Sequence, residues 1–213
     1  MGGWRNAAAA TLAGACLFAH LESGTAQVVA EPALLTAGIP VSETFMPYVA
    51  IPKDAVVLGG MLRFPVSEDV DIGGRAGLWL IDDRHDTPFV GADVRYGLLL
   101  RPLTPGGGQL ALSFDVGIGV SDPGPTVWRI PLGFIAGIGF SLAGGDSEIF
   151  AHPRFDLGVS SGEDNFDTGL VLDVGGVFSI TPTLGAIIDF RFGKGPFDDS
   201  DRVVVALGGI WRL

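Results

Sequence analysis

The sequence predicts an all-β fold, a closed antiparallel up-and-down barrel of ten strands that crosses a membrane. Three observations carry this prediction. Apolar and polar residues alternate with a period of two from about residue 55 to the last residue. The apolar half of this alternation contains no charge. The polar half combines arginine and aspartate with many of the 33 glycines of the chain.

The first 26 residues have the features of a cleaved secretory signal peptide. Arg5 precedes a short apolar run over residues 7–19, and Ala26 provides a small residue for cleavage. That run is shorter than the roughly 20 residues of a spanning helix, which favours cleavage over a membrane anchor. The only cysteine, Cys16, lies in this segment, so the mature chain is expected to have no disulfide and no cysteine metal ligand. The residues before Cys16 also resemble a lipoprotein box, although the leucine stands one position too far away.

Nine strands can be placed from the alternation and from the Pro, Gly, Asp and Ser clusters between them. They are expected at about residues 55–64, 69–82, 89–101, 109–121, 127–142, 148–160, 166–180, 184–192 and 202–213. A further strand is expected from residues 27–54, where 44–51 is the better candidate and 28–37 the other. The chain thus divides into a signal peptide (1–26), an N-terminal segment (27–54) and a barrel (55–213). An eight-strand barrel, without a strand at 55–64, remains open.

The charges of the polar face are nearly balanced between arginine and aspartate, which form planar bidentate pairs suited to buried networks. Because unpaired charges in a confined space are costly, we expect these side chains to neutralise one another. A narrow conducting lumen is the alternative. The predicted interior network is Arg63, Asp71, Arg75, Asp93, Arg95, Arg101, Asp115, Arg129, His152, Arg154, Asp156, Asp167, Asp173, Asp189, Arg191 and Arg202.

Two further features indicate that the polar face is inside and the apolar face meets lipid. Both lysines of the chain, Lys53 and Lys194, lie outside the predicted strands, whereas glycines stand among the arginines, as a narrow interior requires. Aromatic residues of the apolar face fall near strand ends, as in the girdles at the two membrane interfaces. These interfacial aromatics are Phe64, Trp128, Phe140, Phe166, Phe178, Phe192 and Trp211.

With these features, the chain resembles the small outer-membrane β-barrel proteins of Gram-negative-type bacteria. The most specific cue is the C-terminus, where apolar residues alternate through Leu207 and Trp211 to Leu213. This stretch is similar to the signal that the barrel-assembly machinery reads, although it ends in leucine instead of phenylalanine. The resemblance implies an outer-membrane location, contact with outer-membrane lipid and assembly by that machinery. It also implies an even number of strands, hence ten, with both termini on the periplasmic side.

The formal net charge of −11, without a basic cluster, argues against a nucleic-acid partner. We expect a monomeric porin-like or structural membrane protein of the cell envelope, with a structural, adhesive or narrow-pore role, no cofactor, no metal and no catalysis. A soluble periplasmic lipocalin-like ligand-binding barrel is the alternative. A less favoured alternative is a membrane hydrolase that uses His85, in an acidic loop, or His152 on the polar face.

Overall fold

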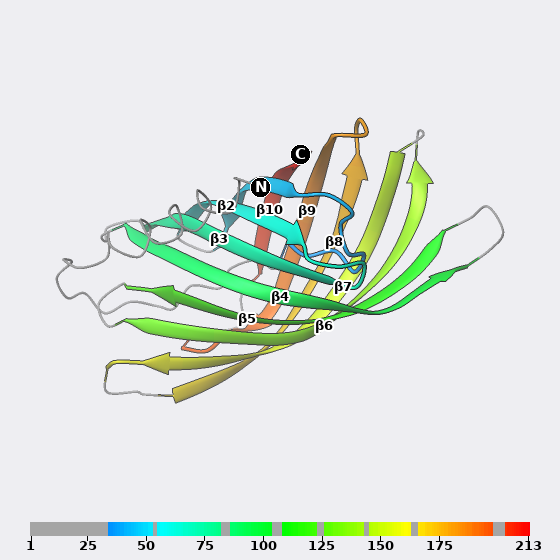
Figure 1. The fold of residues 1–213 in the computed structure, drawn as a ribbon. Helices are drawn as coiled ribbons and strands as arrows, with labels where there is room; N and C mark the ends of the chain where they lie inside the picture. Colours follow the sequence, from blue (N-terminus) through cyan, green and yellow to red (C-terminus); the bar gives the residue numbers. More distant parts are fainter. Residues whose placement is uncertain are drawn as a thin grey trace, which may run out of the picture.

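The computed structural model is a single closed barrel of ten antiparallel strands in sequence order (Figure 1). It describes residues 34–52, 55–81, 86–103, 108–122, 126–142, 145–162, 166–197 and 203–213. The strands are β1 (Thr44–Ile51), β2 (Ala55–Pro65), β3 (Val70–Ile81), β4 (Thr87–Pro102), β5 (Gln109–Ser121), β6 (Val127–Leu142), β7 (Gly145–Ser160), β8 (Phe166–Ser179), β9 (Leu184–Lys194) and β10 (Val204–Arg212). The prediction of a ten-strand up-and-down barrel is therefore confirmed, and the eight-strand count is wrong.

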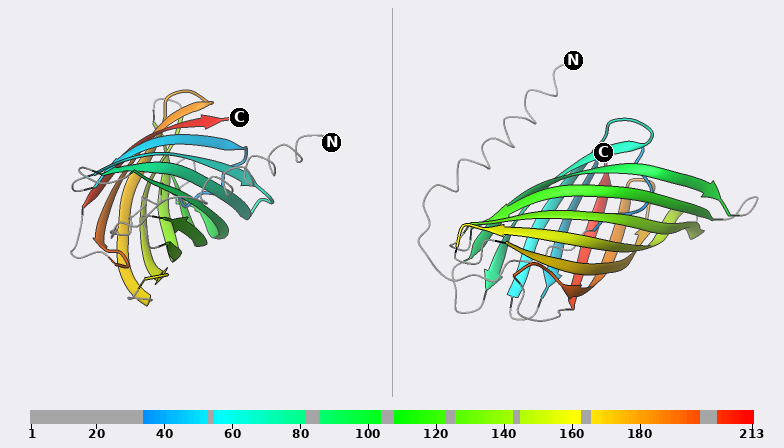
Figure 2. Two further views of the ribbon diagram at one scale, coloured as in Figure 1. Left: turned by 90° about the vertical axis from the view of Figure 1, so that its left-hand side faces the viewer. Right: turned by 90° about the horizontal axis from the view of Figure 1, so that it is seen from below.

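The barrel closes between its first and last strands. β1 pairs with β10 from Thr44↔Arg212 to Ile51↔Val205, and the N–H of Leu213 donates to the carbonyl of Glu43 at 2.9 Å. We call the end of the barrel at this point the C-terminal rim, and the opposite end the loop rim. Figure 2 shows the closed wall from two further directions, with β1 beside β10.

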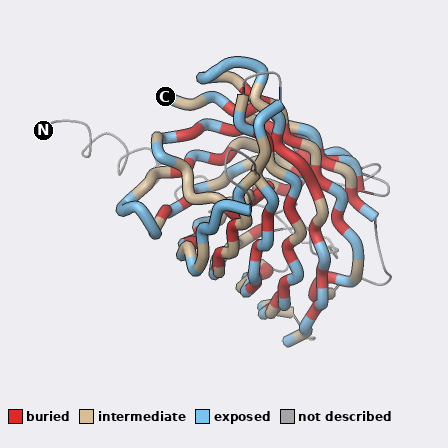
Figure 3. The backbone as a smooth tube through the Cα atoms, turned by 90° about the vertical axis from the view of Figure 1, so that its right-hand side faces the viewer, coloured by how far each residue is buried: buried red, intermediate tan, exposed pale blue. Residues whose placement is uncertain are grey.

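Burial alternates along the strands as the sequence pattern predicts. Figure 3 shows the alternation of buried and exposed positions around the wall. In β6, Leu132, Phe134 and Ile138 are 41%, 51% and 51% exposed, whereas Ile135 between them is fully buried. The apolar face therefore points outward and the polar face inward, and Ile135 fills an interior position. No helix in the described ranges is long and apolar enough to span a membrane.

Aromatic rings lie over glycines of the neighbouring strand inside the barrel. Tyr48 stands opposite Gly59, and an added Cβ on that glycine would lie 2.4 Å from the ring. Phe89 relates in the same way to Gly77, and Phe150 to Gly175. A narrow interior needs small residues beside large ones, and these cross-strand pairs supply them. Large interior apolar residues, which the sequence analysis did not anticipate, thus account for many interior glycines.

One irregularity reverses the assigned face of Arg101. The pairing of β4 with β5 shifts between Gly97 and Leu99, so Arg101 stands opposite Leu110. Leu110 belongs to the outward parity of β5, and Arg101 is exposed. Because a one-residue shift moves every later side chain to the other face, its assignment to the interior network was wrong.

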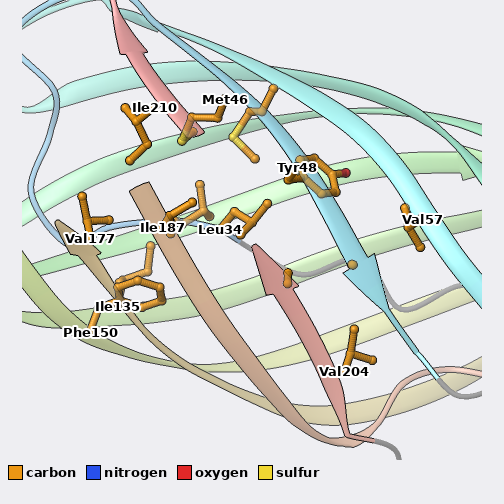
Figure 4. Close-up of a cluster of buried hydrophobic side chains, with 14 of the residues drawn as sticks. Leu34, Met46, Tyr48, Val57, Ile135, Phe150, Val177, Ile187, Val204 and Ile210 are labelled. Atoms are coloured by element: carbon orange, nitrogen blue, oxygen red, sulfur yellow. The ribbon is translucent and has the colours of Figure 1, made fainter. Parts of the chain in front are cut away.

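Residues 34–38, which we call the inner segment, lie inside the barrel in its C-terminal half. Leu34, Leu35 and Ala37 are at most 2% exposed and belong to a cluster of buried apolar side chains from the wall. Figure 4 shows Leu34 among Ile187 and other members of this cluster. Residues 28–37 therefore do not supply a strand in their described part, and the chain enters β1 only at Thr44.

Candidate functional site: the barrel lumen

The first ion-pair group of the lumen joins β2, β3 and β4. The Arg63 guanidinium donates to both carboxylate oxygens of Asp71 and, through Nη1, to Asp93 Oδ1 at 2.7 Å. Arg75 donates to the other oxygen of Asp93 at 2.8 Å, and Arg95 donates to Asp71. Asp71 is fully buried and Arg95 is 1% exposed. These five charges form a chain of alternating sign that leaves little room for water.

The second group joins β6, β7, β8 and β9. The carboxylate of Asp156, which is fully buried, forms ion pairs with Arg129 at 3.0 Å, Arg154 at 3.4 Å and Arg191 at 3.8 Å. The Nε of Arg154 also lies 3.3 Å from Asp173. Gly133 makes space for this group, because a Cβ there would lie 2.7 Å from the Cβ of Arg154. Both groups cross the middle of the lumen and tie most strands of the wall together.

Two predicted network members bind main-chain N–H groups, and a third lies outside the described residues. The carboxylate of Asp189 accepts from the N–H of Leu34 at 3.1 Å and so holds the inner segment. Asp167, near the loop rim, accepts from the N–H of Phe197 at 2.7 Å and from the N–H of Thr168. Arg202 lies outside the described residues, and so does the loop histidine His85.

His152 is a wall residue with no exposed surface. Its Nε2 lies 2.7 Å from Asp115 and its Nδ1 lies 3.7 Å from Asp173. This geometry places the imidazole between two carboxylates inside the ion-pair layer, where an external substrate has no access. Within the described ranges, no group of three or more His, Cys, Asp or Glu side chains could hold a metal ion.

Glu148 of β7 is an interior charge that the sequence analysis missed. Its Oε1 accepts from the N–H of Ala37 at 2.6 Å, and its Oε2 accepts from the N–H of Gly38 at 3.3 Å. Arg95 complements it by donating to the carbonyl of Thr36 and, at 3.2 Å, to the Thr36 hydroxyl. The parity of β7 could have identified Glu148, because it shares the inward side with His152. Nothing in the local sequence predicts that its partner is the chain's own backbone.

The two described cavities differ strongly in size. Towards the loop rim, a space of ≈ 30 Å³, about one water molecule, is lined by Arg75, Arg129 and Arg154. Around the inner segment and out to the C-terminal rim, a cavity of ≈ 1210 Å³ is lined by residues that include Arg63, Arg95 and Glu148. The lumen is therefore tight in the middle and spacious at the C-terminal end.

The outer surface is an apolar belt bounded by aromatic residues. Trp128, Phe166 and Phe192, near the loop rim, are 46%, 64% and 42% exposed. Phe178 and Trp211, near the C-terminal rim, are 37% and 44% exposed, while Phe64 and Phe140 at that rim are partly buried. Phe45, not anticipated from the sequence, packs beside Trp211 with ring centroids 6.4 Å apart. In the final stretch, Leu207 and Leu213 are 53% and 71% exposed.

Comparisons with known proteins find similarity among solved structures only. No family model matches the chain, and no curated protein matches it. The N-terminal β-barrel domain of Pseudomonas aeruginosa OprF is 13% identical, with a TM-score of 0.38 over 81% of this chain and 97% of that domain. The β domain of the Bordetella autotransporter BrkA is 11% identical, with a TM-score of 0.47 over 81% and 99%. Neisserial surface protein A is 10% identical, with a TM-score of 0.34 over 81% and 95%.

The two faces of the barrel wall show which environment the barrel fits. The outward positions of the strands are uncharged apart from the outward Arg101 near the end of β4 and Lys194 at the end of β9. Each strand pairs with a neighbour on both sides around the closed barrel. In hydrocarbon all backbone N–H and C=O groups must be paired within the protein, and a closed barrel with an uncharged outer surface meets this requirement. Charged side chains such as those of the interior would be costly on that surface. The protein therefore has the architecture of the bacterial outer-membrane β-barrels that its sequence resembles.

Proposed function

We propose that this chain is an integral outer-membrane β-barrel with a structural role, and that its lumen does not conduct solutes. Contact with outer-membrane lipid through the apolar belt, and recognition of Leu207, Trp211 and Leu213 by the barrel-assembly machinery, are parts of this proposal. The soluble periplasmic ligand-binding barrel is not supported, because it would expose the apolar belt to water.

A single observation supports the closed lumen: protein groups lie across the interior at three successive levels. Val57, Trp79 and Phe89 are buried towards the loop rim. The two ion-pair groups cross the middle, and a space of ≈ 30 Å³ lies on their loop-rim side. The inner segment and its apolar cluster lie in the C-terminal half, beside the cavity of ≈ 1210 Å³. An ion would have to break several buried ion pairs to pass, which is costly in a medium of low dielectric.

Conductance in planar bilayers tests the proposal. Purified protein is expected to insert without stepwise current, and vesicles that contain it should retain a trapped sugar. A matched variant, Arg129→Ala with Arg154→Ala, removes two charged side chains that line the ≈ 30 Å³ space. If that variant conducts while the natural chain does not, the packed ion-pair layer is the barrier. Stepwise currents from the natural chain would instead support the narrow-pore role.

A further inference from the structure

The inner segment is held by three charged side chains from three different strands. Asp189 of β9 accepts from the N–H of Leu34, Arg95 of β4 donates to the carbonyl of Thr36, and Glu148 of β7 accepts from two successive N–H groups. Apart from one bond to the Thr36 hydroxyl, all these contacts are with main-chain atoms. Contacts of this kind recognise the main chain of a peptide and not a particular polar side chain.

The wall is shaped around this segment. A Cβ on Gly137 would lie 2.4 Å from Glu148 Oε1 and 2.8 Å from the Cβ of Ala37, so any larger residue would displace one of them. Arg95 also donates to the fully buried Asp71, which fixes its guanidinium before any peptide arrives. The two leucines of the segment belong to a buried apolar cluster that also includes Met46, Met61, Phe150, Ile187 and Ile210.

The site is also open to one end. The cavity of ≈ 1210 Å³ that surrounds the inner segment reaches turn residues of the C-terminal rim, including Glu68 and Asp69. Its volume exceeds the roughly 300–1,000 Å³ of ordinary ligand pockets. The two ion-pair groups lie across the middle of the lumen, so the cavity leads to this rim, the periplasmic side in the expected orientation.

We propose that the C-terminal half of the lumen is a peptide-binding site, which residues 34–38 occupy in cis and which accepts a short aliphatic segment of another polypeptide in their place. Main-chain anchors, an aliphatic lining and a wide entrance are the three properties that such a site needs. The ligand class is a stretch of small and branched apolar residues with free main-chain N–H groups. This goes beyond the structural role proposed above and does not require conduction.

The test uses the full chain in detergent micelles and a dye-labelled peptide of the sequence of residues 34–41. The natural chain is compared with Leu34→Asp/Ala37→Pro, which places a carboxylate beside Asp189 and removes one N–H donor to Glu148. Both proteins also carry Thr36→Cys and Cys16→Ser, so that the thiol introduced by Thr36→Cys is the thiol measured. Reaction of this thiol with a maleimide reports release of the inner segment. The double variant is expected to release the segment and to bind the peptide saturably, at least ten-fold more tightly than the natural chain.

Two matched controls make the result specific. Adding Glu148→Gln to the double variant should weaken peptide binding about ten-fold, because a charge-assisted bond to two N–H groups is replaced by a neutral one. Adding Glu68→Gln should leave peptide binding unchanged. Glu68 lines the cavity but is not a partner in the hydrogen bonds to the inner segment described above. A peptide N-methylated at the alanine should bind as weakly as in the Glu148→Gln variant.

Three outcomes would overturn the proposal. One is a double variant that releases the segment but fails to bind the peptide. Another is binding that neither Glu148→Gln nor N-methylation weakens, because the peptide would then adsorb elsewhere. The third is a thiol introduced by Thr36→Cys that stays protected in the double variant, because the assigned contacts would then not hold the segment. None of these outcomes depends on the conductance experiment.

Discussion

At the scale of single residues, the outer face tolerates charge only at the rims. Leu132 lies in the uncharged belt, whereas Leu142 ends β6 at the C-terminal rim. Both are about equally exposed, at 41% and 50%. Leu132→Arg is expected to destabilise the barrel by about 2–4 kcal/mol and Leu142→Arg by at most about 1 kcal/mol. Urea titrations in lipid vesicles measure both, and equal values would contradict the assignment of the belt to hydrocarbon.

We expect the loss of an interior charge to destabilise the barrel more than the loss of a surface charge. Asp71 is fully buried and pairs with both Arg63 and Arg95. Asp71→Asn would leave two buried guanidinium groups with less compensation, and we expect a loss of about 3–5 kcal/mol. Asp69→Asn, in the exposed turn nearby, should change the free energy of unfolding by less than about 0.5 kcal/mol. A near-neutral Asp71→Asn would show that the network does not hold the barrel together.

At the scale of the strands, the interior glycines are spacers for specific neighbours. An added Cβ at Gly133 of β6 would lie 2.4 Å from Nε2 of His152, whereas at Gly74 of β3 it would meet nothing within 4 Å. Gly133→Ala is therefore expected to cost about 1–3 kcal/mol, through displacement of the packed His152 side chain. Gly74→Ala should be neutral or slightly stabilising, because a glycine in a strand loses more backbone entropy. Thermal unfolding in detergent checks both, and similar melting temperatures would contradict the spacer role.

The strand register decides which arginines are interior. The shift between Gly97 and Leu99 turns the last part of β4 over, and Arg101 is the arginine that it moves outward. A bulge cannot be recognised from alternation when the residues around it are all apolar. Here Leu98, Leu99 and Leu100 follow one another. Parity counted from the sequence was therefore correct up to Gly97 and wrong for Arg101.

At the scale of the whole molecule, closure of β1 on β10 removes the last free strand edges. A closed barrel with a filled interior should keep its shape in cold sodium dodecyl sulfate. We expect the unboiled protein to migrate faster than the boiled protein on a gel, and the Leu132→Arg variant to lose this shift where assembly fails. Identical migration of boiled and unboiled natural chain, recovered from membranes, would contradict the closed fold.

The amino-acid sequence by itself predicted nine strands of the wall and its two faces, because a period of two assigns each residue to a face without knowledge of its neighbours. The tenth strand followed from the family resemblance, and the structure decided between ten strands and eight. The sequence also marked most of the charges that lie inside. Only the tertiary structure decided what those charges touch. Glu148 and Ala37 are 111 positions apart, and Leu34 and Asp189 are 155 apart, so no local pattern couples them. The inner segment itself has no periodicity, because its place is fixed by the cavity that the closed wall leaves and not by its own backbone preference.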